Sequence, residues 1–197
     1  MPSLLKRLAV PALLIALAAC GRHETPPPAS FKGTDISGAS FGGDFSLTAH
    51  NGERKSLSDF KGKAVALFFG YTHCPDVCPT TMLEYAAVTK SLGRDAQKLQ
   101  VLFVTVDPER DTREVLAGYV PHFDPAFLGM TGSRAQVDEV MSRFRIVAQR
   151  VAVPGGGYSV DHSAGSYLFD PEGRLRVYEP YATPSASLTH DIRELLR

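Results

Sequence analysis

The sequence predicts an α/β sandwich, in which helices cover both faces of a central mixed sheet and the chain closes with a β-hairpin and a helix. Two near-continuous apolar runs, residues 65–69 and 101–106, are typical of strands buried on both faces of a parallel sheet. Segments with apolar residues at helical spacing follow each run. Two alternating segments near the C-terminus flank residues 170–173, whose sequence Asp-Pro-Glu-Gly favours a tight turn.

The first half of the predicted domain contains a hairpin, the two buried strands and a helix between them. The alternating residues 45–48 and the Asn-Gly pair at 51–52 predict the hairpin. Residues 80–92 predict the helix, because their apolar side chains recur every three or four positions.

The second half of the domain is predicted to contain three helices and the C-terminal hairpin. Asp111 with Glu114, and Ser133 with Gln136, have the spacing of capping boxes and are expected to begin two of the helices. The second of these has an apolar stripe made of Val137, Val140, Met141, Phe144 and Ala148. The hairpin is expected to join residues 166–169 to 175–178, and the last helix has an apolar face made of Leu188, Ile192, Leu195 and Leu196.

Composition narrows the classes of function. The chain has 197 residues, which suggests one domain with extensions, and its 44% of hydrophobic residues are enough for a core. Lys+Arg and Asp+Glu both number 21, so no excess charge favours nucleic acid or a lipid surface. Three cysteines are too few for a disulfide scaffold, and the four methionines do not cluster into a metal site.

The N-terminal region reads as an export signal followed by a tether. Residues 1–19 combine Lys6 and Arg7 with an apolar stretch that is too short to span a bilayer. The small residues before Cys20 resemble a bacterial lipoprotein cleavage site, so Cys20 is expected to carry the lipid. Residues 20–43 are rich in Pro, Ser and Gly and are expected to be a flexible tether. The domain is then expected at residues 44–197, anchored to a membrane by lipid on the periplasmic, extracytoplasmic side.

Two cysteines lie where a buried strand gives way to a helix. Cys74 and Cys78 are four residues apart, about one helical turn, so both sulfurs can lie on one face. Pro79 is expected at the first helical position. The positive end of the helix dipole would favour thiolates, which attack disulfides and also bind soft metals. The dithiol alone leaves both chemistries open.

A histidine far along the chain is a possible third partner. Imidazole with two thiolates forms a three-coordinate site suited to Cu(I), and the same set accepts Cu(II) with a further ligand. His162 is one of six histidines, and a single histidine beside a strand is more often structural. His73 and Asp76 lie next to or between the cysteines, but a neighbouring side chain usually points elsewhere, and Asp76 fits a helix start.

Three segments together resemble the Sco/SenC family of copper-binding proteins: GYTHCPDVCPTT at residues 70–81, TVDPERDT at 105–112 and YSVDHS at 158–163. The resemblance covers about residues 41–197 and implies a thioredoxin-like fold. It also implies that Cys74, Cys78 and His162 bind one copper ion. Members of the family are associated with delivering copper to the copper-bearing subunit of cytochrome c oxidase, or with keeping the thiols of its copper site reduced.

Two acidic residues and a glycine run are expected near this site. Asp107 ends a buried strand and either tunes the site or binds a loop, and Asp161 is expected to orient the loop of His162. The glycines at 155–157 are either a hinge that moves His162 onto the metal or a plain loop.

The main alternative function is that of a thiol–disulfide oxidoreductase acting through Cys74 and Cys78. The one-turn spacing permits a disulfide. However, thioredoxin-type exchangers have two residues between the cysteines and a proline before the strand that follows, whereas residues 163–165 contain none. A thiol peroxidase is disfavoured because Tyr71 stands where that family has a threonine.

Overall fold

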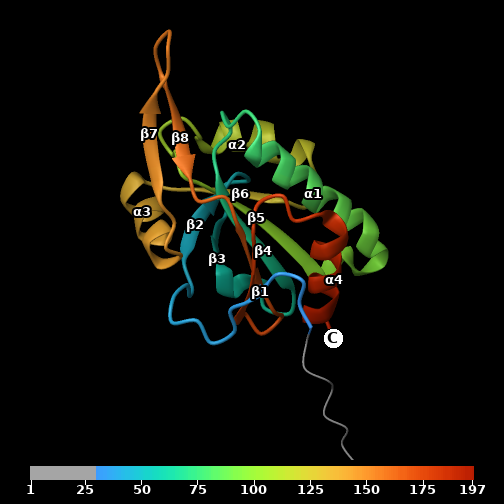
Figure 1. Ribbon diagram of the computed structural model, residues 1–197. Helices are drawn as coiled ribbons and strands as arrows, with labels where there is room; N and C mark the ends of the chain where they lie inside the picture. The colour runs from blue at the N-terminus through green and yellow to red at the C-terminus, as the bar shows by residue number, and fades with distance from the viewer. Residues whose placement is uncertain (1–29) are drawn as a thin grey trace, which may run out of the picture.

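The computed structural model describes residues 30–197, which form an eight-stranded mixed sheet with helices on both faces (Figure 1). The strand order is β1-β10-β9-β4-β5-β6-β2-β3, and β7 pairs with β8 in a separate two-stranded sheet. The strands are β1 (Thr34–Asp35), β2 (Ser46–Ala49), β3 (Arg54–Ser56), β4 (Ala64–Gly70), β5 (Leu99–Thr105), β6 (Leu128–Thr131), β7 (Ala148–Ala152), β8 (Tyr158–His162), β9 (Ser166–Phe169) and β10 (Leu175–Glu179). The α-helices are α1 (Val77–Leu92), α2 (Arg113–Tyr119), α3 (Arg134–Arg143) and α4 (Ser185–Leu195).

The two apolar runs form the parallel centre of the sheet, as predicted. β4 and β5 pair in register from Ala64 with Leu99 to Gly70 with Thr105. All seven residues of each strand are buried. Side chains alternate between the two faces, and so both sets of alternate residues are mainly apolar; the buried exceptions are Gln100 and Thr105 near the ends of β5.

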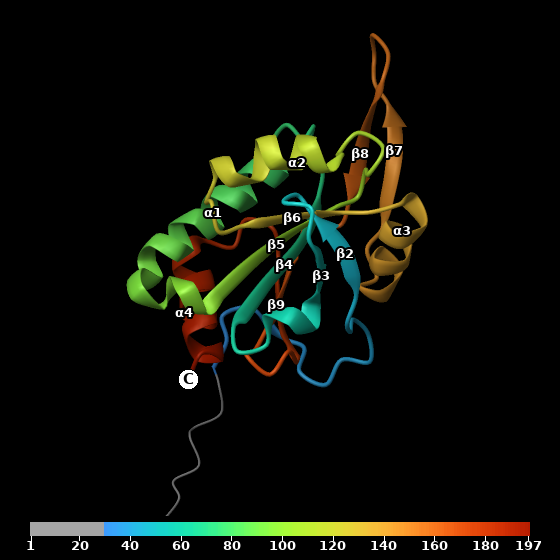
Figure 2. The same cartoon turned by 180° about the vertical axis from the view of Figure 1, so that it is seen from behind.

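Each face of the sheet has its own core. Ala64, Ala66 and Phe68 of β4 pack under α1, α2 and α4, whereas Val65 and the other alternate residues pack with α3 and the 3-10 helix Leu57–Phe60. Figure 2 shows α1, α2 and α4 on one side of the sheet and α3 on the other. The predicted sandwich, with its C-terminal hairpin and helix, is confirmed.

The predicted start of one helix is confirmed and the starts of two others are wrong. Ser133 and Gln136 form the expected capping box of α3. Thr112, and not Asp111, caps α2 by accepting the Val115 N–H, while Asp111 is buried. Helix α1 begins at Val77, so Pro79 is its third residue, where a missing N–H still costs no intrahelical bond.

The sequence prediction carried α3 too far. Arg145 adopts a left-handed conformation with φ 55°, and the Ile146 N–H donates to the Met141 carbonyl oxygen at 2.8 Å. This arrangement is the Schellman ending of a helix, usually signalled by a glycine. Because arginine replaces the glycine, the sequence gives no stop signal, and Ala148 begins strand β7 instead of ending the apolar stripe of the helix.

The domain begins before residue 44. The N–H groups of Lys32 and Gly33 donate to the buried carboxylate of Asp191 in α4, and β1 pairs with β10. These residues fall within the stretch expected to be a tether, so the described part of that stretch is fixed to the domain. The expected signal segment and Cys20 lie outside the described residues. Within residues 30–197, no helix is long and apolar enough to cross a membrane.

Gly70 ends β4 in a place that has no room for a side chain. A Cβ atom there would lie 2.6 Å from Cys78 Sγ and 2.8 Å from Phe103 Cε2. We therefore expect Gly70→Ala to lower the free energy of unfolding by about 1–3 kcal/mol through overpacking, measured as a lower urea midpoint. Gly118→Ala is the matched control, because a Cβ there meets no atom within 4 Å and alanine favours the helix. Equal midpoints for the two variants would contradict this account.

Candidate metal centre

Two sulfurs and one imidazole meet at the carboxyl end of β4. Cys74 lies in the loop between β4 and α1, Cys78 in the first turn of α1, and His162 at the end of β8. Their donor atoms lie within 4.8 Å of one another, although 84 residues separate Cys78 from His162. Atoms bound to one ion through metal–ligand bonds of about 2.3 Å lie up to ~4.6 Å apart, so the three donors are close to that limit.

The ring of His162 is oriented with a free nitrogen towards the sulfurs. Its Nδ1 lies 2.8 Å from the Ser163 carbonyl oxygen, and because a carbonyl only accepts, Nδ1 donates this hydrogen bond. The lone pair of the neutral ring is then on Nε2, which lies 3.6 Å from Cys78 Sγ. The Tyr71 ring packs edge-on against the imidazole at 5.9 Å, and its hydroxyl accepts the Val160 N–H. The histidine is therefore held in the tautomer that a metal requires.

The environment of Cys74 favours its thiolate. Hydrogen bonding from the Cys78 thiol lowers the pKa of Cys74 to about 5, and the backbone N–H groups of Asp76 and Cys78 act in the same direction. The Cys78 N–H lies 3.4 Å from Cys74 Sγ. These donors lie at the N-cap and in the first turn of α1, where N–H groups have no intrahelical partner. Cys74 is half-buried, so the thiolate is open to an incoming group.

Cys78 has the opposite character. Its thiol is 1% exposed, and its hydrogen bond to Cys74 together with burial raises its pKa. The apo site therefore holds one thiolate and one thiol, and the pair shares a single negative charge. Both cysteines are free in this structure.

Asp107 binds the β7–β8 hairpin, which carries His162, and does not contact the donor atoms. Its side chain is fully buried, and four side chains contact it: Arg110, Arg134, Arg150 and Tyr158. Arg150 belongs to β7 and Tyr158 to β8, so one carboxylate holds both strands. Of the two roles expected for Asp107, binding a loop is the one that the structure shows.

The other acidic and histidine side chains near the cysteines have lesser roles. Asp161 is exposed, and within the described part of the chain its carboxylate takes part in no hydrogen bond or ion pair, so it does not orient His162. His73 is exposed and contacts Thr72, outside the group of three donors. Asp76 precedes α1 and accepts from Thr80, as expected for a helix start.

The sequence analysis missed two residues that support the site. Asp111 is fully buried and accepts hydrogen bonds from Thr72 N, Thr72 Oγ1 and Thr105 Oγ1 at 3.0, 2.6 and 2.7 Å. It thereby fixes the backbone two residues before Cys74, while burial raises its pKa. Arg110 donates to the Tyr158 carbonyl oxygen at 2.8 Å and stacks on the Tyr158 ring. Both residues lie in the segment 105–112, where the capping spacing of Asp111 pointed to a helix start and only the resemblance pointed to the site.

The glycine run lies away from the histidine. Gly155, Gly156 and Gly157 have φ values of 88°, 98° and 86° and form the tip of the β7–β8 hairpin. These values suit glycine and explain the run by the turn alone. His162 lies at the opposite end of β8, so the turn accounts for these glycines without a role in moving the histidine.

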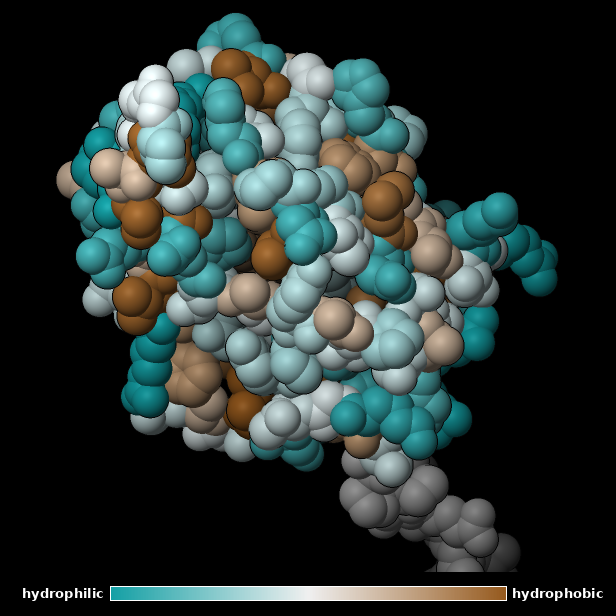
Figure 3. Space-filling model, turned by 45° about the horizontal axis from the view of Figure 1, so that its top comes forward, coloured by the Kyte–Doolittle hydropathy of each residue, from teal (hydrophilic) through white to brown (hydrophobic). Residues whose placement is uncertain are grey.

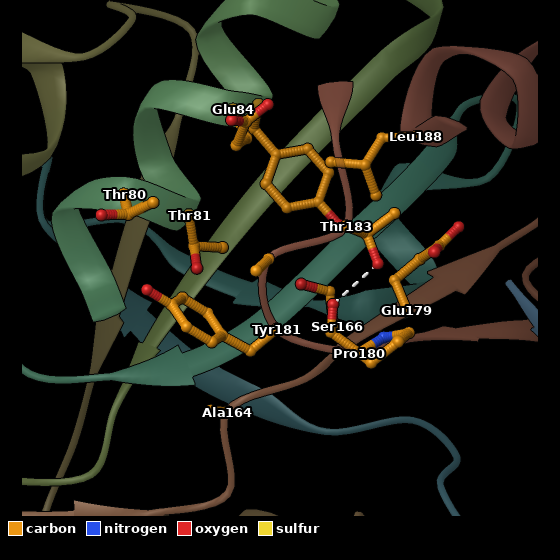
Figure 4. A pocket seen from close by; sticks show the side chains of 12 residues that line it. Thr80, Thr81, Glu84, Ala164, Ser166, Glu179, Pro180, Tyr181, Thr183 and Leu188 are labelled. Atoms are coloured by element: carbon orange, nitrogen blue, oxygen red, sulfur yellow. Dashed lines mark hydrogen bonds between the residues drawn. The ribbon is translucent and has the colours of Figure 1, made fainter. Parts of the chain in front are cut away.

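Two of the donor residues, Cys74 and His162, line a cleft between the α1 loop and β8. Its other lining residues are Tyr71, Pro75, Asp76, Val77, Ser159, Val160, Asp161 and Ala164. A second, narrower cavity lies between α1 and the segment that follows β10 (Figure 4). Its lining includes Glu84, Glu179 and Tyr181 but no cysteine or histidine. Among the described residues, the only cysteines, and so the only thiolate ligands for a soft metal, lie at the first cleft.

Comparison with known proteins places these features in a family. The family model described as SCO1/SenC matches residues 33–197. The SCO2 homolog of Bos taurus mitochondria is 40% identical over 156 residues, which is 77% of this chain and 58% of the relative. The human mitochondrial SCO1 homolog is 40% identical over 144 residues, or 70% of this chain and 46% of the relative. The chain spans about half the length of these curated relatives.

Solved structures agree with the fold. The structure of Bradyrhizobium japonicum ScoI with copper bound is 38% identical and has a TM-score of 0.74, covering 80% of this chain and all of the other. The solution structure of apo Sco1 from Thermus thermophilus is also 38% identical, with a TM-score of 0.75, covering 86% of this chain and 99% of the other. The expected thioredoxin-like fold is confirmed. With a family model matched over most of its length and relatives of this similarity, the chain belongs to the SCO1/SenC family.

Proposed function

We propose that this chain is a copper metallochaperone that binds one copper ion through Cys74, Cys78 and His162. The observation that carries the proposal is the meeting of two sulfurs and a correctly oriented imidazole within 4.8 Å. Two thiolates and one imidazole favour Cu(I), and the same residues accept Cu(II) when water or a carboxylate completes the set. The copper-bound ScoI of Bradyrhizobium japonicum supports the choice of metal.

The two sulfurs differ in exposure, and this difference gives a route for releasing the ion. Cys78 is buried beneath the site, whereas Cys74 and the His162 ring line the open cleft. An incoming thiolate or imidazole reaches a three-coordinate ion from this side and replaces the ligands one at a time. The recipient that we propose is the copper-bearing subunit of cytochrome c oxidase during its assembly, whose thiols the same site would also keep reduced.

We further propose that the chain is exported and held at a membrane by lipid on Cys20. The support is the sequence of the first 20 residues, in which small residues precede Cys20 after a short apolar stretch. The domain would then face the periplasmic, extracytoplasmic side. Mass measurement of the exported chain tests this: a mature N-terminus other than a lipid-modified Cys20 would contradict it.

A thiol–disulfide oxidoreductase is the second candidate function. The observation in its favour is the pairing of an accessible Cys74 with a buried Cys78, which suits an attacking and a resolving thiol. A disulfide between the two would also prevent copper binding, so oxidation would control loading.

The copper titration distinguishes the two functions. We expect the reduced chain to bind one equivalent of Cu(I) under anaerobic conditions. His162→Ala and Cys78→Ser are each expected to weaken binding at least about tenfold, because even a residue that only orients a ligand contributes 10–100-fold. His73→Ala is the matched control and is expected to bind like the parent chain. No copper binding by the parent, with insulin disulfides still reduced by His162→Ala, would support the reductase instead.

The thiolate on Cys74 gives a pH-dependent prediction. Because its pKa is about 5, alkylation of the reduced, metal-free chain by iodoacetamide should rise through that pH and level off above it. Below the pKa the sulfur is protonated and unreactive. Cys78→Ala removes the thiol that donates to Cys74, so the profile should move up towards the ordinary cysteine value of about 8.5. A profile that does not move in Cys78→Ala would show that this hydrogen bond has no such effect.

A further inference from the structure

The β7–β8 hairpin stands apart from the main sheet, and one of its edges is unpaired. Figures 1 and 2 both show it extending beyond the helices. The Ser163 N–H donates to the Val147 carbonyl oxygen, and the Val153 N–H to that of Gly157, so odd-numbered residues of β7 pair inward. The N–H and carbonyl groups of Ala148, Arg150 and Ala152 therefore point away from β8.

The corresponding outer edge of β8 is closed. The Val160 N–H donates to the Tyr71 hydroxyl at 3.2 Å, and Arg110 donates to the Tyr158 carbonyl oxygen at 2.8 Å. No described residue supplies such a partner along the outer edge of β7, where four of the five residues are exposed. The hairpin therefore offers one free edge, and it belongs to β7.

One face of β7 and its two flanking residues is apolar and uncharged. Val147, Val151 and Val153 are 70%, 39% and 38% exposed, half of the six large apolar side chains that are exposed among the described residues. Gln149, on the same face, carries no charge, and Arg150 turns to the other side to contact Asp107. Free edges are normally guarded by charges, proline or a covering element. Arg150, held on the opposite face, and Pro154 at the tip leave this apolar face uncharged, and its free backbone edge beside the metal cleft is suited to pairing.

We propose that the free edge of β7 receives an extended segment of the copper-accepting protein by strand addition. This inference rests on the proposed copper function and identifies how the acceptor docks. Ala148 lies directly opposite His162 in the hairpin register, so an added strand runs two strand spacings, about 10 Å, from the His162 backbone. Main-chain hydrogen bonds supply affinity, and apolar side chains at alternate positions of the segment meet the valines.

The size of the edge favours a transient occupant over a permanent one. A second copy of this chain is the competing occupant, but pairs of five-residue strands bury far less than the roughly 1,200–2,000 Å² of a stable interface. Figure 3 shows apolar residues on the end that carries the hairpin only as small patches separated by polar ones. The contacts of Asp107 with Arg150 and Tyr158 hold the edge in place before docking, which lowers the entropic cost of binding.

The test follows Cu(I) transfer from the full chain to the reduced, metal-free copper-binding domain of a cytochrome c oxidase subunit. Val151→Lys places a charge on the apolar face. Ala152→Pro removes an outward N–H without breaking the hairpin ladder. Each is expected to slow transfer at least about fivefold, the effect of one ordinary hydrogen bond, while leaving Cu(I) affinity unchanged.

The controls match these variants in exposure and position. Val115→Lys changes a valine of α2 that is also 39% exposed, and Ala152→Ser keeps the backbone N–H. Both should transfer copper like the parent chain. Equal slowing by Val115→Lys, or transfer by Val151→Lys at the parent rate, would overturn the proposal.

Amide exchange tests the edge independently of copper. With both proteins metal-free, the amides of Ala148, Arg150 and Ala152 should exchange at least about fivefold more slowly when the acceptor domain is added. No added protection would overturn the docking proposal even if copper binds as proposed. Conversely, a parent chain that binds no Cu(I) would overturn the proposed function while this measurement still decides the edge. A dimer of the chain alone that Val151→Lys abolishes would show that a second copy is the occupant.

Discussion

The site depends on the attachment of β8 to the loop that carries Cys74. The strand belongs to a separate hairpin, and nothing in the ladder of the main sheet fixes its position. Tyr71 and Arg110 bind its outer edge through Val160 and Tyr158, and Asp107 holds both strands from below. These contacts bring His162 next to the two sulfurs, although 84 residues separate it from Cys78. Tyr71, Arg110 and Asp107 therefore position the strand that carries His162, and none of their side chains contacts the two sulfurs or the Nε2 atom through a hydrogen bond.

A second constraint is the single negative charge shared by the two sulfurs. The first turn of α1 supplies N–H donors to Cys74, while Cys78 lies against the sheet at Gly70. Stabilising one thiolate and burying one thiol makes the pair unequal before any ion arrives. The same inequality suits copper transfer and thiol exchange. The difference between the two functions then lies with His162, because copper binding needs its free Nε2 as a ligand, whereas in thiol exchange the ring would only add to the stabilisation of the Cys74 thiolate.

The sequence predicted the centre of the main sheet, its two hairpins, its helices and the three donors, but not strands β1 and β6. β4 and β5 were predictable because burial on both faces favours a nearly continuous apolar run. β7 was missed because four of its five residues are exposed and Arg145 ends α3 without a glycine. Asp111 was taken for a cap, since capping spacing alone does not distinguish a surface carboxylate from a buried one. His162 could be chosen among six histidines only through resemblance, because its partners are brought together by the fold.

The hydrogen bonds from the Lys32 and Gly33 N–H groups to Asp191 attach the start of the domain to α4. They fix the point of departure of the preceding chain beside α4, near the amino end of β4, whereas the sulfurs lie at the carboxyl end of that strand (Figure 1). Seven residues of extended strand separate the two ends by about 20 Å. If Cys20 carries the proposed lipid, the eleven residues between it and Lys32 span at most about 40 Å. On the proposed anchor, the copper site would lie on the side of the domain away from the tether, and copper acceptors would be met only within a limited distance of the bilayer.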